Sequence, residues 1–133
     1  MMTSPFKPDA QACCETTADL GSSKDETFTA LLNELAADIH DNNVAHGFYE
    51  GGENYGEKIA LMHSELSEAL ENIREGFPPD KHLPEFMGVE VEMADTVIRI
   101  LDTCHKNGWR LGEAILAKHA YNKTREFRHG KAF

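Results

Sequence analysis

Apolar residues recur along most of this chain at the three- and four-residue spacing of amphipathic helices, and this periodicity constrains the fold more than any other feature. Four segments carry the pattern, and glycine and proline residues separate them. We predict helices over residues 25–43, 54–75, 89–106 and 111–127. No segment has the alternating pattern of a strand, and no internal repeat is present. The sequence therefore predicts an all-α fold, a four-helix bundle with short connections.

The third predicted helix, residues 89–106, is apolar on most of its circumference. Its polar side chains form a narrow strip of Glu92, Asp95, Thr96, Arg99, Asp102 and Thr103. A helix of this kind is usually buried, yet a chain of 133 residues has room for only a small core. We therefore expect a homo-oligomer, either a homodimer or a tetramer.

The chain divides into a tail and one domain. Residues 1–24 mix Ser, Thr, Pro, Asp and Gly without periodicity, which is typical of a disordered or loosely attached segment. The helical domain is expected to span residues 25–133, a length that fits a single domain.

The charge balance bears on the partners of the protein. The formal net charge is −10, from 23 acidic and 13 basic residues. A field of this sign repels polyanions, so we expect no binding to a DNA or RNA polymer. A small anionic substrate is compatible with this field, because a bound divalent cation can reverse it locally.

Cysteine content and hydropathy bear on location. Cys13, Cys14 and Cys104 fit neither a disulfide framework nor a zinc knuckle, and are typical of free thiols in a reducing compartment. No apolar run approaches the roughly 18 residues of a membrane span, and the N-terminus has no secretory signal pattern. These features predict a cytoplasmic protein that does not associate with membranes.

Two pairs of carboxylates mark the second and third predicted helices: Glu65 with Glu68, and Glu92 with Asp95. Residues three apart share a helix face, so each pair can direct two carboxylates to one point. Four like charges repel unless cations neutralise them, and oxygen-only ligands favour Mg²⁺ or Mn²⁺. The alternative is that both pairs are solvated helix faces. A di-iron centre is disfavoured, because neither pair contains histidine.

A basic stripe follows on the last predicted helix, where Lys118, Asn122 and Arg125 share one face. Such donors suit the phosphate oxygens that a metal ion leaves free. The alternative is structural, since the two cations can pair with nearby glutamates or interact with the C-terminus of their helix.

Taken in order, three segments resemble the MazG-like all-α nucleoside triphosphate pyrophosphohydrolases, a superfamily that includes dimeric dUTPases and dCTP pyrophosphatases. These segments are "SELSEALENIREG", "EVEMADTVIRILD" and "KHAYNKTREFRHGKAF". The resemblance covers about residues 27–133. It implies hydrolysis of an NTP or dNTP to NMP and pyrophosphate, with Mg²⁺, or Mn²⁺ as a substitute, held by Glu65, Glu68, Glu92 and Asp95.

The resemblance also implies roles for individual residues. Glu65 or Glu68 would orient or deprotonate the attacking water, and the nucleotide would be bound by Lys118, Asn122 and Arg125. In the family, the first helix and the loop after it shape the base pocket, which makes candidates of His40, Phe48 and Tyr49. Relatives often line this pocket with Trp, whereas the single Trp of this chain is Trp109.

Two alternatives remain beside this interpretation. One is a narrower enzyme of the same fold, such as a dUTPase, a dCTP pyrophosphatase or a phosphoribosyl-ATP pyrophosphohydrolase. The other is a non-catalytic helical interaction module, in which both acidic faces are simply solvated.

Overall fold

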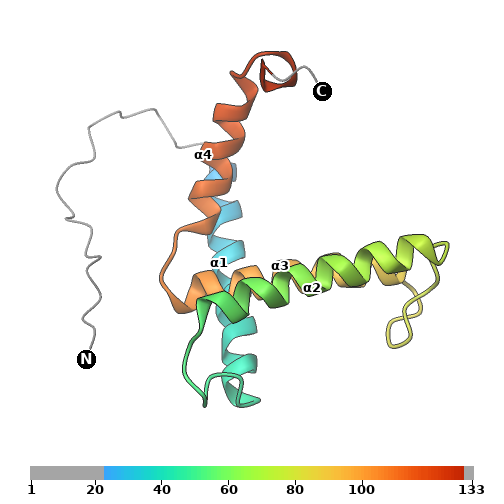
Figure 1. Ribbon diagram of the computed structural model, residues 1–133. Coiled ribbons are helices and arrows are strands. Elements are labelled where there is room, and N and C mark those ends of the chain that lie inside the picture. Colours follow the sequence, from blue (N-terminus) through green and yellow to red (C-terminus); the bar gives the residue numbers. More distant parts are fainter. Residues whose placement is uncertain (1–22, 131–133) are drawn as a thin grey trace.

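The computed structural model describes residues 23–130, and these residues are helical apart from their connections (Figure 1). The elements in chain order are α1 (Ser23–Ala45), α2 (Tyr55–Arg74), α3 (Gly88–Lys106), α4 (Leu111–Lys123) and the 3₁₀ helix η1 (Phe127–Gly130). Between residues 23 and 130 the extended pairing is limited to one isolated bridge, from Pro79 to Met87. The prediction of an all-α chain with four helices is confirmed.

The helix boundaries follow from local capping. The Asn54 side chain accepts a hydrogen bond from the backbone N–H of Glu57 at 3.2 Å, which satisfies a free donor at the start of α2. At the start of α3 the arrangement is reversed, because the Glu90 side chain in the first turn accepts a hydrogen bond at 2.8 Å from the backbone N–H of Met87, the residue before the helix. At its other end α2 stops where Gly76 turns left-handed, with φ 87°. Of the predicted tail, residues 1–24, only the last two fall within the described residues, where they begin α1.

The predicted end of the fourth helix is wrong. We expected it to continue to residue 127, but α4 ends at Lys123. The Thr124 hydroxyl donates to the carbonyl of Tyr121 at 2.7 Å, and the backbone N–H of Thr124 reaches the same carbonyl at 3.0 Å. These bonds span three residues instead of four, so they tighten the last turn and end the α-helix.

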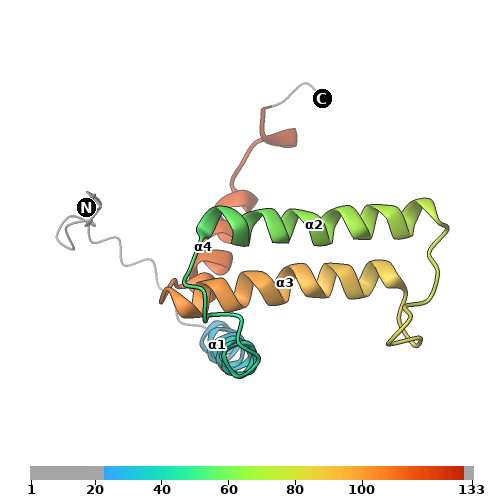
Figure 2. The ribbon, with the colours of Figure 1, turned by 60° about the horizontal axis from the view of Figure 1, so that its bottom comes forward.

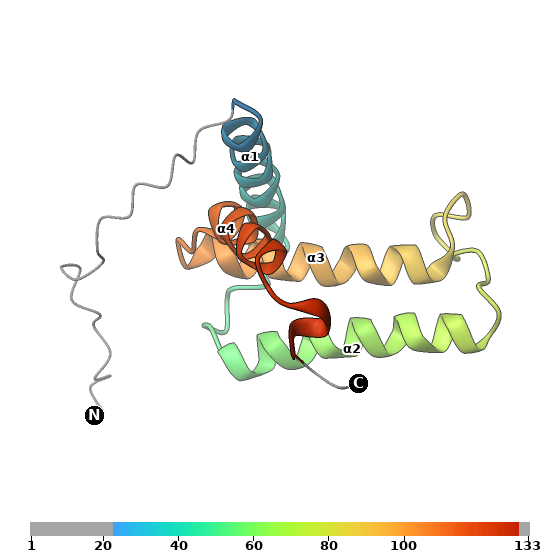
Figure 3. The ribbon, with the colours of Figure 1, turned by 90° about the horizontal axis from the view of Figure 1, so that it is seen from above.

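α3 lies between α2 and α1 (Figure 2). α2 and α3 form an antiparallel hairpin, and α1 crosses the opposite side of α3 and also contacts α4. Figures 1 and 3 show α1 and α4 at one end of the hairpin, while its other end projects beyond them. This central position accounts for part of the apolar surface of α3, since Leu101 is buried while Met93 and Val97 remain exposed.

Two glycines allow the helices to approach closely. A Cβ added to Gly88 would lie 2.1 Å from the side-chain oxygen of Asn72, so any larger residue would displace the Asn72 side chain where the start of α3 meets α2. A Cβ added to Gly112 would lie 3.1 Å from the Thr29 methyl, where α4 meets α1. These contacts set the distance between α2 and α3 and the position of α4 on α1.

The core of the described chain is small. The apolar residues that are buried are Ala36, Ala69 and Leu101. Large apolar side chains on the helices stay open to solvent, including Leu31, Leu35, Leu70, Ile73, Met93 and Val97. None of the described helices combines the length and the apolar composition that crossing a membrane requires.

Candidate metal centre

Glutamates from α2 and α3 converge between the two helices of the hairpin. Glu65 and Glu68 lie one turn apart on α2, and Glu92 approaches them from α3. Each offers a carboxylate oxygen, and the three atoms lie within 4.8 Å of one another. The structure thus brings together three of the four predicted metal ligands.

The position of these carboxylates makes their negative charge costly. Glu65 is 8 % exposed, Glu92 is half-buried and Glu68 is exposed. Burial first, and then the neighbouring carboxylates, raise the pKa of Glu92 to about 6. A divalent cation between the three oxygens would remove this repulsion, and carboxylate oxygens are the donors that a hard cation such as Mg²⁺ prefers. The donor set therefore fits a hard divalent ion.

Asp95, the fourth predicted ligand, lies outside this group of three and lines the adjoining cavity. Burial and the charge of Glu65 raise the pKa of Asp95, while Arg99 acts in the opposite direction. Asp95 therefore shares the negative field of the cluster without being one of its three converging ligands.

Arg99 is a site residue that the sequence analysis did not single out. Its Nε donates to Oε1 of Glu65 at 2.6 Å, across the hairpin from α3 to α2. The only sequence signal was a single cation inside the acidic strip of the third helix. Glu65 and Arg99 lie 34 residues apart in the sequence, and their pairing depends on how α2 packs against α3, which residue spacing does not predict.

A cavity of about 330 Å³ opens beside the carboxylates. Glu65, Asp95 and Arg99 line one part of it. Residues from the end of α1, the following loop, the first turn of α2 and the last turns of α3 also line it, among them Asn43, Phe48, Lys58, Asp102 and Thr103. The cavity thus joins an acidic region with one cation to a region of amide, aromatic and hydroxyl groups.

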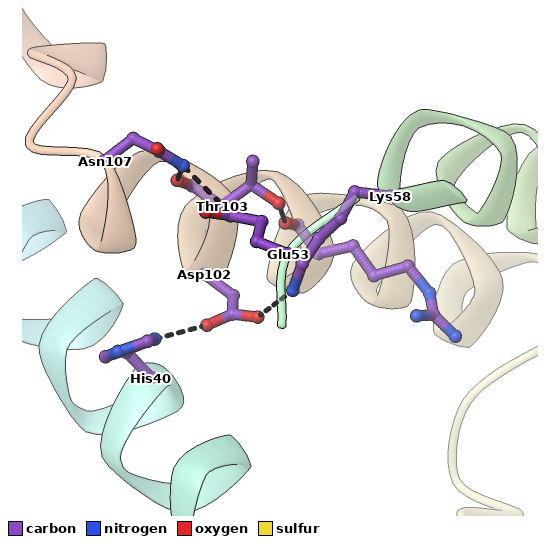
Figure 4. A network of polar contacts seen from close by, with 7 residues as sticks. His40, Glu53, Lys58, Asp102, Thr103 and Asn107 are labelled. Atoms are coloured by element: carbon purple, nitrogen blue, oxygen red, sulfur yellow. Dashed lines mark hydrogen bonds and ion pairs between the residues drawn. The ribbon is translucent and has the colours of Figure 1, made fainter. Parts of the chain in front are cut away.

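A second polar network ties α1, α2 and α3 together around Asp102 (Figure 4). The Asp102 side chain is 6 % exposed, and it contacts Nδ1 of His40 at 2.7 Å and Nζ of Lys58 at 3.5 Å. Burial alone would raise the pKa of Asp102, but these partners outweigh it and hold that pKa below its usual range. His40 was predicted to bind nucleotide, but its Nδ1 is instead hydrogen-bonded to Asp102.

Tyr49, also predicted to bind nucleotide, belongs to this network as well. Its ring lies under the Lys58 ammonium, 4.0 Å from the ring centroid, and meets the His40 ring edge-on at 4.8 Å. Its hydroxyl is buried without a hydrogen-bond partner in the described part of the chain. Burial and the nearby charge of Asp102 raise the pKa of this hydroxyl. Phe48 lines the cavity instead, with 69 % of its surface exposed.

The predicted basic stripe lies away from the carboxylates within one chain. Lys118 and Asn122 are exposed residues of α4, whose contacts run to α1, and Arg125 follows the end of that helix. Lys118 Nζ lies 4.8 Å from the ring centroid of Tyr121. Trp109 stacks on Tyr55 with centroids 6.0 Å apart, so it anchors the start of α4.

Comparisons of the chain with models of known protein families, with curated proteins and with solved structures found no match.

Proposed function

We propose that this protein is a Mg²⁺-dependent nucleoside triphosphate pyrophosphohydrolase that converts an NTP or dNTP and water to NMP and pyrophosphate. The observation that carries the proposal is the convergence of three glutamate oxygens within 4.8 Å at the edge of a cavity of about 330 Å³. The ordered resemblance of the acidic pairs and the basic stripe to the MazG-like superfamily supports the same activity.

The chain supplies the metal ligands and the water-activating group. Glu65, Glu68 and Glu92 would hold Mg²⁺, with Mn²⁺ as a substitute and Asp95 as the fourth carboxylate. When bound, the ion supplies positive charge against the phosphate oxygens. Glu65 accepts from Arg99, whereas none of the described side chains donates to the carboxylate of Glu68. Glu68 is therefore the better candidate to orient or deprotonate the attacking water.

The nucleoside would lie in the part of the cavity away from the carboxylates. The loop residue Phe48 offers an exposed ring there, and Asn43 offers an amide. Asp102 and Lys58 compensate each other at 3.5 Å, and Glu57 adds one carboxylate to the lining of this region. A base can stack and form hydrogen bonds in such surroundings without displacing an ion pair.

The active form is proposed to be a homo-oligomer, a homodimer or a tetramer. Leu35, Ile39, Met93 and Val97 line an apolar hollow between α1 and α3, and Leu35 and Val97 are 50 % and 51 % exposed. Open apolar surface of this kind is typical of a protein interface. Lys118, Asn122 and Arg125, which lie away from the carboxylates of their own chain, would then serve the site of a second copy.

The test is to incubate the purified protein with each common NTP and dNTP, in Mg²⁺ and in EDTA, and to identify the products. NMP and pyrophosphate that form only with the metal would establish the activity and rank the substrates. Glu68→Gln should lose at least about a hundredfold in turnover, as expected for loss of a general base. Glu71→Gln removes the same charge from an exposed position on α2 and should leave turnover unchanged.

The same experiment separates the remaining alternatives. With dUTP and phosphoribosyl-ATP added to the panel, cleavage of only dUTP, dCTP or phosphoribosyl-ATP would indicate the narrower enzyme of this fold. The open apolar surface on α1, α2 and α3 is the observation that favours a non-catalytic interaction module. Absence of product from every nucleotide, together with no thermal shift on adding Mg²⁺, would support that module and overturn the proposed activity.

A further inference from the structure

Arg99 forms a short ion pair across the hairpin, and its partner is a proposed metal ligand. Nε of Arg99 lies 2.6 Å from Oε1 of Glu65. The Glu65 side chain is 10 % exposed and that of Arg99 is 39 % exposed. A buried carboxylate and a half-open guanidinium at this distance form a charge-assisted hydrogen bond. Arg99 is therefore the counter-ion that compensates Glu65 when no metal is present.

The guanidinium of Arg99 has N–H donors that form no hydrogen bond with the described residues. An arginine carries five N–H donors, and within residues 23–130 only the bond from Nε is formed. Arg99 also lines the cavity together with Glu65 and Asp95. The other basic side chain on this cavity, Lys58, is held by Asp102 at 3.5 Å and by the Tyr49 ring at 4.0 Å. Arg99 is thus the cation with free donors at the carboxylate end of the cavity.

A divalent ion and Arg99 compete for the same carboxylate. Once an ion is bound by Glu65, the guanidinium no longer compensates an unpaired charge and is repelled by the ion. Phosphate oxygens that enter with the ion offer the guanidinium a new anionic acceptor, and its fork of donors matches phosphate geometry.

We propose that Arg99 exchanges partners, from Glu65 in the empty site to a phosphate oxygen of the nucleoside triphosphate once the metal is bound. This inference rests on the proposed function and adds a phosphate-binding residue from α3. Arg99 then has two opposite effects, because it weakens the binding of the metal alone and strengthens the binding of the polyphosphate.

The test measures both effects on the full-length protein by titration calorimetry. The first probe is Mn²⁺ alone, and the second is inorganic triphosphate in saturating Mg²⁺, which needs no knowledge of the preferred base. Arg99→Gln should bind Mn²⁺ about tenfold more tightly, the effect expected from removing one unit charge beside a divalent ion at a solvent-like dielectric. It should bind triphosphate about tenfold to a hundredfold more weakly, because it loses a hydrogen bond between charged groups.

Two further variants complete the design. Arg74→Gln removes the same charge from α2, where Arg74 pairs with Glu71 on the exposed face at 3.3 Å, and should leave both affinities unchanged. Arg99→Lys keeps the charge beside Glu65 but loses the fork, so it should bind Mn²⁺ like the wild type and triphosphate more weakly. This variant decides the matter if Arg99→Gln fails to fold.

The outcomes are distinguishable from failure of the proposed function. If the wild type binds neither Mn²⁺ nor triphosphate, the metal centre itself is wrong. If the wild type binds both, and Arg99→Gln weakens both or neither, or Arg99→Lys binds triphosphate like the wild type, the exchange of partners is refuted while the metal centre stands.

Discussion

Replacing Glu92 by Gln should stabilise the metal-free protein and at the same time remove its response to Mg²⁺. Burial and neighbouring carboxylates raise the pKa of Glu92 from 4.5 to about 6. An interval of this size corresponds to about 2 kcal/mol of unfavourable free energy in the charged form. Since Glu92 is only half-buried, solvent screening reduces the expected gain to about 1 kcal/mol. In this size range that is a rise in Tm of roughly 3 to 6 °C.

The pH dependence gives the sign of the effect. A group whose pKa is raised by folding contributes stability that is fully present below its unfolded pKa and is lost as pH rises through the folded value. For Glu92 this window lies between pH 4.5 and about 6. The free energy of unfolding of the wild type should therefore fall by about 1 kcal/mol across this window relative to that of Glu92→Gln. Above the window, the unfolding free energies of the two proteins should depend on pH in the same way.

The assay is urea unfolding at pH 5 and pH 7.5, first in EDTA and then in Mg²⁺. Glu92→Gln should be the more stable protein in EDTA at pH 7.5, and only the wild type should gain stability from Mg²⁺. Glu71→Gln, on the exposed face of α2, is the matched control and should behave like the wild type. A Glu92→Gln variant that is no more stable in EDTA, or that keeps the full Mg²⁺ response, would refute the electrostatic reasoning.

Three further predictions concern the hairpin and its surfaces. Asp102→Asn should lower the free energy of unfolding in urea by about 3 kcal/mol, because it removes the charge of a carboxylate that is 6 % exposed and paired with His40. A loss under about 1 kcal/mol would mean that the network behaves like a surface ion pair. Gly88→Ala should destabilise by about 1–3 kcal/mol, since its Cβ would lie 2.1 Å from the Asn72 side chain, and Asn72→Ala should rescue it. Unchanged stability would contradict the close approach. Val97→Glu, at a side chain 51 % exposed beside the apolar hollow, should lower the mass in light scattering to that of the monomer; an unchanged oligomer would place the interface elsewhere.

The helices of this fold could be predicted because their signals are local. Asn54 and Gly76 act within one turn of the helix that they bound, so the limits of α2 come within a residue of the expected ones. The end of α4 was predicted wrongly, because the Thr124 hydroxyl bonds to a backbone carbonyl and ends the helix early. Residue spacing describes apolar faces well, but it does not show whether a side chain forms a hydrogen bond with its own backbone.

The candidate site was predictable to the extent that it depends on one helix at a time. Spacing by three residues places Glu65 beside Glu68, and the packing of α3 on α2 brings Glu92 to them. The pairing of Arg99 with Glu65 and that of Asp102 with His40 join residues 34 and 62 positions apart. Such partners depend on the rotation of each helix about its axis, which apolar periodicity defines only to within a broad stripe.

The small core and the acidic cluster act on stability in the same direction. The apolar side chains buried in residues 23–130 are two alanines and one leucine, and the converging glutamates add repulsion to the folded state. A ligand that binds only the folded chain stabilises it by mass action, and so does a second copy that covers its apolar faces. The proposed metal centre and oligomer therefore predict a Tm that rises with both Mg²⁺ and protein concentration. A Tm that depends on neither would contradict both proposals at once.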